Sequence, residues 1–270
     1  MLDKKLTQLE HYFKSLGKVI VAFSGGADSA FLAAVAQKSL PQNCLLAVLA
    51  DSATFPPSEK THELKVLSEL KIPHKLIFID ELGNADFVKN DTQRCFFCRE
   101  GLFTSIKHLS EEMGWPHIVE GTNKDDEADY RPGKKAILEL GIKSPLKELG
   151  FTKAEIRELS QKMGLSTWNK PSMACLSSRI PYGDKITPEK IYRISESETF
   201  LRSLGLTQVR VRDHGEVARI EILPHEFSIL LQNTLYVAVI KSLGFKYVTL
   251  DCEGYRTGSM NALLKVAHGA

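Results

Sequence analysis

The sequence has no long hydrophobic run and no strong excess of charge of either sign. No stretch approaches the ~18 consecutive apolar residues that a membrane-spanning helix needs, so we expect no membrane span. The 270 residues include 35 lysines and arginines against 33 acidic residues, a formal net charge of +2. A balance this even gives no general attraction to nucleic acid. We therefore expect neither a membrane nor a nucleic acid as partner.

Cysteine is scarce as well, with five in the chain. The first nine residues have the pattern of an amphipathic helix rather than of a secretory signal. Few cysteines without such a signal argue against a disulfide framework and favour reduced thiols, metal ligands or catalysis in a cytoplasmic protein. Cys44 and Cys252 lie in apolar, strand-like runs, which predicts that both are buried structural cysteines.

What the sequence does have is an alternation of strand-like and helix-like segments over its first 120 residues. We predict strands over 19–23, 44–50, 75–79 and 117–119, and helices over 30–36, 57–71 and 98–113. This alternation predicts an α/β fold, a parallel sheet with helices on both faces. Ligands of such sheets bind at the carboxyl ends of the strands, where the polar stretches 24–26, 51–52 and 120–123 would lie.

The pattern changes after Gly183. It predicts helices over 187–204 and 224–243 and strands over 208–212, 217–223 and 247–250. Helices and strands in this order indicate a smaller α+β domain with antiparallel pairing. We therefore predict a first domain over 1–182, a second over 183–260 that serves substrate binding or oligomerisation, and a flexible tail over 261–270.

Residues 24–29, Ser-Gly-Gly-Ala-Asp-Ser, form the most informative motif. They lie between an apolar strand and an apolar helix, where a helix N-terminus presents unpaired N–H groups and partial positive charge. Two glycines let backbone amides approach an anion, and the serines add hydroxyl donors. The stretch therefore predicts a phosphate site. It lacks the Gly-Lys-Ser/Thr ending of a Walker A loop. It resembles instead the SGGxDS signature of the PP-loop ATP pyrophosphatases, which cleave ATP between the α and β phosphates and adenylate a carboxylate or carbonyl oxygen.

A second motif places Cys95 and Cys98 three residues apart. On a helix, side chains with this spacing share a face and lie about 5–6 Å apart, so both thiolates can reach one metal. The alternative is two cysteines at a helix start with Phe96 and Phe97 in the core. Cys175 is a candidate third ligand. Zinc normally takes four protein ligands, whereas three thiolates can hold a [4Fe–4S] cluster with one iron open, against the usual four.

Six motifs together, in this order, resemble the LarE family of ATP-dependent sulfur transferases, which act in nickel-pincer nucleotide biosynthesis. They are residues 24–29, 94–98, 120–126, 129–133, 171–179 and 209–215, and the resemblance covers about residues 1–260. It implies that ATP adenylates each carboxylate of pyridinium-3,5-biscarboxylic acid mononucleotide. Each is then converted to a thiocarboxylate, with release of AMP and pyrophosphate. It also implies a homo-oligomer.

The family obtains its sulfur in two ways. One type sacrifices the sulfur of a single cysteine, and the other carries a C-x-x-C motif plus the shared cysteine and is associated with a [4Fe–4S] cluster. Cys95, Cys98 and Cys175 make this chain similar to the second type, with Cys175 nearest the activated carboxyl as sulfur donor or cluster ligand. A thiolate at Cys175 benefits from a nearby cation. Arg179 is a candidate, although a surface salt bridge explains it almost as well.

The remaining site residues combine motif position with the resemblance. Asp28 is the first candidate for binding Mg²⁺, which neutralises charge that develops on the phosphates. Glu120 and Asp126 are weaker candidates, because acidic residues at strand ends often cap a turn or are solvated. The predicted nucleotide-binding residues are Ala22, Phe23, Ser24, Gly25, Gly26, Asp28, Ser29, Asp51, Ser52, Gly121 and Thr122.

Arg210 and Arg212 lie two apart on a predicted strand and so face the same side. Arginine forks match the geometry of phosphate. The resemblance implies that this pair binds the 5′-phosphate of the substrate, with Arg179 as a further substrate-binding candidate. A solvated strand face is the alternative explanation.

Two other functions stay open on the sequence alone. A PP-loop tRNA thiolase also uses adenylation and cysteines or a cluster, but the near-neutral charge and the lack of an aromatic-plus-basic stretch argue against RNA binding. A nucleotide-binding regulator that has lost catalysis is the second alternative. The presence of Asp28 and Cys175 argues against it.

Overall fold

The computed structural model describes residues 2–128, 133–171 and 174–261. The chain divides into two compact units, one of residues 1–84 and 92–173 and the other of residues 85–91 and 174–270. Within the described ranges, no helix is both long enough and apolar enough to cross a membrane. Apart from its first residue, the predicted tail lies outside the described residues.

The first unit is built on a four-stranded parallel sheet, as the sequence predicts. Its strands are β1 (Val19–Ala22), β2 (Leu45–Asp51), β3 (His74–Phe78) and β4 (His117–Val119), in the order β3-β2-β1-β4. All three pairings are parallel. The order reverses between β1 and β4, and such a reversal opens a crevice at the carboxyl ends of the strands.

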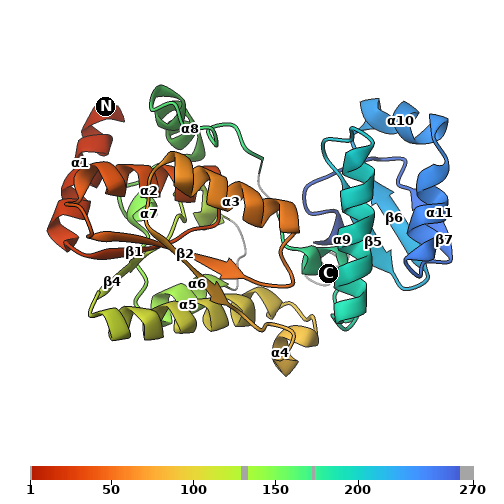
Figure 1. The fold of residues 1–270 in the computed structure, drawn as a ribbon, viewed down its shortest axis with the longest axis horizontal. Coiled ribbons are helices and arrows are strands. Elements are labelled where there is room, and N and C mark those ends of the chain that lie inside the picture. The colour runs from red at the N-terminus through yellow and green to blue at the C-terminus, as the bar shows by residue number, and fades with distance from the viewer. Residues whose placement is uncertain (1, 129–132, 172–173, 262–270) are drawn as a thin grey trace. The chain divides into compact units, whose positions relative to one another are not determined.

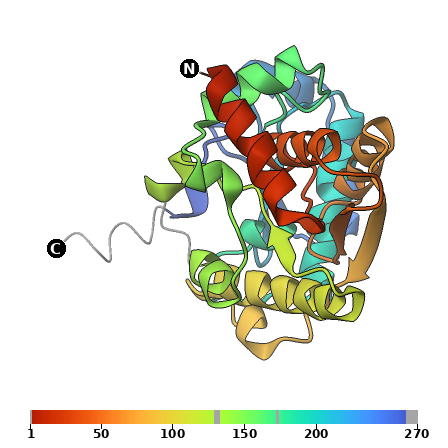
Figure 2. The ribbon, with the colours of Figure 1, turned by 90° about the vertical axis from the view of Figure 1, so that its left-hand side faces the viewer.

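Helices cover both faces of this sheet. One face carries α1 (Leu2–Leu16), α2 (Ala27–Ser39), α3 (Pro57–Glu69) and α8 (Lys153–Lys162), and the other carries α5 (Arg94–Met113) and α6 (Gly133–Glu139) (Figure 1). Figure 2 shows red α1 and yellow-green α5 on opposite sides of the strands. Alternate residues of β1 belong to two apolar cores, Val19 and Val21 to one and Ile20 to the other, because successive strand side chains point to opposite faces.

Two helices of this unit, α8 and the short α7 (Pro145–Glu148), are not among the predicted elements. A local signal for α8 was nevertheless present. Thr152 accepts a hydrogen bond from the Glu155 N–H, and the Glu155 carboxylate accepts one from the Thr152 N–H. This capping box is recognisable as Thr-x-x-Glu in the sequence, and it fixes the start of the helix.

The second unit contains a three-stranded sheet of order β5-β6-β7, beside helix α9 (Pro188–Ser203). The strands are β5 (Arg210–His214), β6 (Val217–Glu221) and β7 (Tyr247–Leu250). The first pair is antiparallel, as predicted, but β6 and β7 are parallel. The prediction of purely antiparallel pairing is therefore wrong. Helical segments connect β6 to β7, and a crossover of this kind returns the chain in the same direction.

The helix predicted over 224–243 is also broken. The chain forms a 3₁₀ turn (Pro224–Glu226), α10 (Phe227–Gln232) and α11 (Leu235–Ser242). Asn233 has extended backbone angles, and its side-chain oxygen accepts a hydrogen bond from the Leu235 N–H. Asparagine competes with helical hydrogen bonds in this way, which explains the break.

The two compact units of the structure do not meet at the domain boundary that the sequence predicts at residue 183. The second unit begins at 174 and includes the segment 85–91, which holds the short helix α4 (Ala85–Val88). Buried Asn90 donates through its side-chain nitrogen to the carbonyls of Pro181 at 2.7 Å and Asp184 at 2.9 Å. These partners are more than 90 residues away in sequence, so no local pattern predicts them.

Candidate functional site

The polar stretches after β1, β2 and β4 lie at the carboxyl ends of parallel strands, as predicted. The loop after β4 approaches the start of α2 closely. A Cβ atom on Gly121 would lie 3.0 Å from the Ser29 nitrogen and 3.3 Å from the Asp28 carbonyl carbon. Only glycine fits there without displacing backbone. The structure thus brings residues 24–29 and 120–122 together at the reversal of strand order.

The loop of residues 24–29 is held by its own serines. Ala22 ends β1, and the Phe23 N–H continues the ladder by donating to the Val48 carbonyl at 2.9 Å. The Ser29 hydroxyl lies 3.3 Å from the Ser24 nitrogen and 3.2 Å from the Gly26 carbonyl oxygen. Gly26 is the N-cap of α2 and supplies no side-chain acceptor. The helix N-terminus therefore has the features that favour an anion.

Asp28 has the properties of a cation ligand. Its Oδ2 atom pairs with Lys153 Nζ at 2.5 Å. Its Oδ1 atom is buried and has no hydrogen-bond partner in the described part of the chain. A buried carboxylate oxygen without a partner is costly, and carboxylate oxygens are the ligands that Mg²⁺ prefers. Asp28 therefore fits a bound Mg²⁺.

Two lysines approach this loop, and the sequence analysis identified neither. Lys153 pairs with Asp28 across 125 residues of sequence, and Lys170 donates to the Gly25 carbonyl across 145 residues. Lys153 is the first residue of α8, and Lys170 directly precedes residues 171–179. Neither position in the sequence predicts a contact with the loop. Together they supply the cationic groups that the loop itself lacks.

Glu63, on α3, packs against Gly25 of this loop. It is 5 % exposed, and a Cβ on Gly25 would lie only 2.4 Å from Glu63 Cγ. Burial raises the pKa of Glu63 to about 7, although the nearby Lys170 lowers it in part. A carboxyl group whose pKa is close to neutral thus packs against the loop of residues 24–29.

The two weaker Mg²⁺ candidates both cap turns. Glu120 Oε2 accepts hydrogen bonds from the N–H and hydroxyl of Thr122, and its Oε1 accepts one from the Ser144 hydroxyl at 2.5 Å. Asp126 Oδ2 accepts one from the Asn123 N–H at 3.1 Å. The hydrogen bonds of Glu120 hold the loop after β4, in line with a capping role, and its role as a Mg²⁺ ligand stays a prediction.

The end of β2 carries a polar group around Glu81. Asp51, the last residue of β2, pairs with Lys60 at 2.7 Å. The Ser52 hydroxyl donates to the Glu81 carboxylate, and the Thr54 hydroxyl donates to it at 3.1 Å. Glu81 is buried, so these donors stabilise its charge.

Cys95 and Cys98 are the second and fifth residues of α5, one helical turn apart. Cys95 is exposed, whereas Cys98 is half-buried and its thiol donates to Glu81 Oε1 at 3.3 Å. Phe96 and Phe97 are half-buried and form an edge-to-face pair with centroids 5.5 Å apart. Outside the residues left undescribed, no three His, Cys, Asp or Glu side chains form a group that could hold a metal ion.

The predictions for the other two cysteines have different outcomes. Cys44 is half-buried and packs against the apolar core that contains Val19 and Val21. Cys252 is exposed, so the prediction of burial is wrong for it. It follows β7 in a turn, where its side chain no longer faces a sheet.

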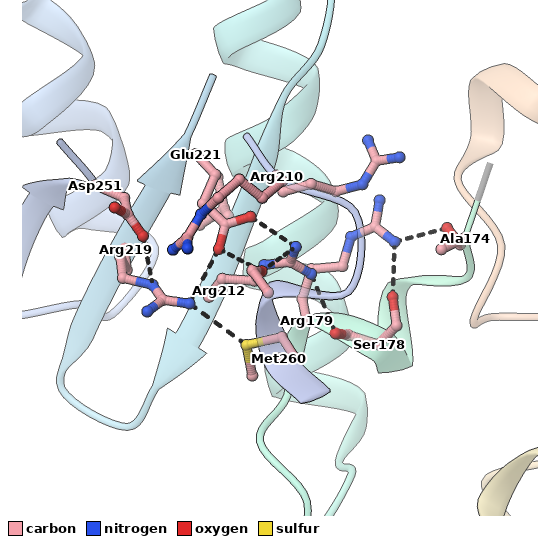
Figure 3. A network of polar contacts seen from close by, with 12 residues as sticks. Ala174, Ser178, Arg179, Arg210, Arg212, Arg219, Glu221, Asp251 and Met260 are labelled. Atoms are coloured by element: carbon pink, nitrogen blue, oxygen red, sulfur yellow. Dashed lines mark hydrogen bonds and ion pairs between the residues drawn. The ribbon is translucent and has the colours of Figure 1, made fainter. Parts of the chain in front are cut away.

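In the second unit, the backbone of Cys175 is fixed by Arg179. Cys175 caps a 3₁₀ turn (Leu176–Arg179) that returns the Arg179 side chain toward it. The guanidinium donates to the carbonyl of Ala174 at 2.6 Å (Figure 3). It also donates to the carbonyl of Cys175 at 2.7 Å and forms two hydrogen bonds with Glu198. Arg179 is predicted as a substrate contact, but it is fully buried and its described contacts are with protein. The substrate-binding role stays a prediction, and in the structure the guanidinium holds the main chain at Ala174 and Cys175.

Arg210 and Arg212 are both buried on β5, so the alternative of a solvated strand face is wrong. Arg212 donates to Glu221 at 2.7 Å and to the Ser178 carbonyl at 3.2 Å (Figure 3). Its Nε is buried without a hydrogen-bond partner among the described residues. Burial lowers the pKa of Arg210 to about 10, with a further contribution from Arg179. The positive charges of neighbouring arginines repel one another, and a bound anion would reduce that repulsion.

The chain is similar to several known proteins. The NAD synthase family model matches residues 2–102. An uncharacterised protein of Synechocystis sp. is 40 % identical over 267 residues, 98 % of this chain and 99 % of that protein. The pyridinium-3,5-bisthiocarboxylic acid mononucleotide synthase of Lactiplantibacillus plantarum is 37 % identical over 268 residues, 98 % of this chain and 97 % of that enzyme. An uncharacterised protein of Methanocaldococcus jannaschii is 28 % identical over 257 residues, 94 % and 98 % of the two chains.

Proposed function

The chain belongs to the LarE family, and we propose that it is an ATP-dependent sulfur insertase. Its substrate is pyridinium-3,5-biscarboxylic acid mononucleotide, and its product carries thiocarboxylates for the nickel-pincer nucleotide. The observation that carries the proposal is 37 % identity over nearly the full length to the synthase of the bisthiocarboxylic product. The loop of residues 24–29 and the buried Arg179–Cys175 contact support the two halves of the reaction.

The first half is adenylation. A substrate carboxylate oxygen attacks the α-phosphorus of ATP, the bond between the α and β phosphates breaks, and pyrophosphate leaves. The Gly25 and Gly26 amides and the Ser24 and Ser29 hydroxyls bind the leaving phosphates. Asp28 would hold Mg²⁺, which would neutralise the charge that develops on these phosphates. The adenosine lies along Ala22 and Phe23, near Asp51 and Ser52 and the Gly121–Thr122 loop.

The second half is sulfur transfer. A sulfur nucleophile attacks the acyl carbon, the acyl–O bond breaks, and AMP leaves with the electron pair. Arg179 fixes the Cys175 main chain through two carbonyls, so that the thiol is presented reproducibly. Arg210 and Arg212 bind the substrate's 5′-phosphate, which fits the buried Arg212 Nε, an atom that has no hydrogen-bond partner among the described residues.

Cys95, Cys98 and Cys175 are proposed as the ligands of a [4Fe–4S] cluster. A cluster held by these thiols would supply sulfide for the transfer. Two of the thiols share one helical turn, a spacing that suits one metal centre. The alternative is sacrifice of the Cys175 sulfur. The protein is proposed to be a cytoplasmic homo-oligomer that binds no nucleic acid.

The experiment combines the purified protein, Mg²⁺-ATP and the biscarboxylic mononucleotide. We expect equal amounts of AMP and pyrophosphate, and a product whose mass shows sulfur in place of oxygen. Cys175→Ala should release pyrophosphate but form no thiocarboxylate, whereas Cys44→Ala, the matched control, should do both. Thiolation of tRNA instead of the mononucleotide, or no pyrophosphate release at all, would contradict the proposal.

A further inference from the structure

Lys170 is a largely buried lysine that no sequence motif singles out. Its Nζ atom donates to the Gly25 carbonyl oxygen at 3.1 Å and forms an ion pair with Glu59 at 2.8 Å. The Lys170 and Glu59 side chains are only 13 % and 14 % exposed. Because water is largely excluded, these charge-assisted hydrogen bonds are stronger than those of a surface pair.

The Gly25 carbonyl and the Gly26 N–H belong to the same peptide unit. In a planar trans peptide the two groups point in opposite directions. An ammonium group bound to the oxygen therefore fixes the N–H on the side away from Lys170. It also draws electron density toward the oxygen, which makes the N–H a stronger donor to an anion.

The other side of Gly25 is held by Glu63. Gly25 has a left-handed backbone, with φ of +61°, and a Cβ there would lie 2.4 Å from Glu63 Cγ. Glu59 and Glu63 are one turn apart on α3, so a single helix provides both the partner of Lys170 and the packing surface beneath the loop. Gly25 is therefore fixed by polar contact at its carbonyl and by packing at its α-carbon.

We propose that Lys170 is a positioning residue for the phosphates of the nucleotide. Through the Gly25 carbonyl it orients and polarises the Gly26 N–H, while its own ammonium stays bound to Gly25 and Glu59. The inference rests on the proposed function only in taking ATP as the ligand of residues 24–29. It predicts that Lys170 affects phosphate binding and leaves adenosine binding unchanged.

The test measures binding of two probes, inorganic pyrophosphate with Mg²⁺ and adenosine, by titration calorimetry. In Lys170→Gln we expect the dissociation constant for pyrophosphate to rise about 10- to 100-fold, the range expected from loss of a charged hydrogen bond. The adenosine constant should change less than about twofold. The matched control, Lys162→Gln, removes the same charge from an exposed pair with Glu158 and should change neither constant.

Two further variants separate positioning from folding. Lys170→Arg keeps a cation that can donate to both acceptors, and it should restore pyrophosphate affinity to within about threefold of wild type. Glu59→Gln leaves Lys170 in place and tests the same contact if Lys170→Gln does not fold. It should weaken pyrophosphate binding and not adenosine binding.

The inference is overturned if folded Lys170→Gln binds pyrophosphate as tightly as wild type, or if both probes weaken equally. Either result would leave the proposed function intact, because the wild-type protein would still bind ATP. A wild-type protein that binds neither ATP nor pyrophosphate would overturn both.

Discussion

The guanidinium of Arg179 and the carboxylate of Glu198 form a two-point ion pair inside the second unit, through hydrogen bonds of 2.8 and 3.1 Å. The side chains are 0 % and 1 % exposed. Burial alone disfavours the charged carboxylate, but the charge and hydrogen bonds of Arg179, together with the charges of Arg202 and Arg210, outweigh it and lower the pKa of Glu198. The pair therefore holds the guanidinium that fixes the main chain of Cys175.

Glu198→Gln should lower the free energy of unfolding by about 3–5 kcal/mol, because it leaves a buried guanidinium without its counter-charge. Urea denaturation measures this change. Glu216→Gln, which removes the carboxylate of an exposed pair with Lys246, is the control and should cost less than about 1 kcal/mol. Similar losses of unfolding free energy in both variants would show that the buried pair contributes no more to stability than the exposed pair.

Asp28→Asn should reduce kcat/KM for pyrophosphate release by about 100-fold or more, because it removes the proposed Mg²⁺ ligand. Stability should change by less than about 1 kcal/mol, since the pair with Lys153 is only partly buried. A magnesium titration of the reaction measures the effect. Unchanged magnesium dependence in Asp28→Asn would exclude Asp28 as the ligand.

Anaerobic reconstitution with iron and sulfide should give about four irons per chain. Cys95→Ala, Cys98→Ala and Cys175→Ala should each lose bound iron, as measured by iron analysis and absorbance, and Cys252→Ala should not. A wild-type chain that binds no iron, and that loses the mass of one sulfur at Cys175 after turnover, would establish the sacrificial route instead.

Glu63 should make the stability of the first unit depend on pH. Its pKa is about 7 in the folded chain against an ordinary 4.5, so the folded state holds a proton that the unfolded state has already lost. Stability is then greatest below pH 4.5 with respect to this group, and it falls as pH rises to about 7. Relative to wild type, Glu63→Gln should gain roughly 3 kcal/mol at pH 8 and nothing at pH 4. Parallel stability curves for the two proteins would contradict this account.

Much of the fold of the first unit is readable from local patterns. The strands β1 to β4 and the helices α2, α3 and α5 lie within a few residues of their predicted positions, because apolar runs and glycine or proline boundaries are local signals. The missed helix α8 had such a signal in its capping box, and the break at Asn233 had one in an asparagine that competes with the helix.

Other features depend on partners far apart in the chain. Contacts between distant segments produce three such features. They are the parallel pairing of β6 and β7, the packing of segment 85–91 within the second unit, and the burial of Arg210. Residue spacing carries no information about them.

The sequence by itself determined the parallel sheet, the glycine-containing loop of residues 24–29 and the cysteine spacing, because each is specified by consecutive residues. Only the tertiary structure decided how these groups are supported. Lys170 contacts Gly25 across 145 residues of sequence. The ion pair with Glu198, on α9, holds buried Arg179 in place beside the main chain of Cys175. Charges inside a protein must find partners, and the packed fold alone sets which ones lie within reach.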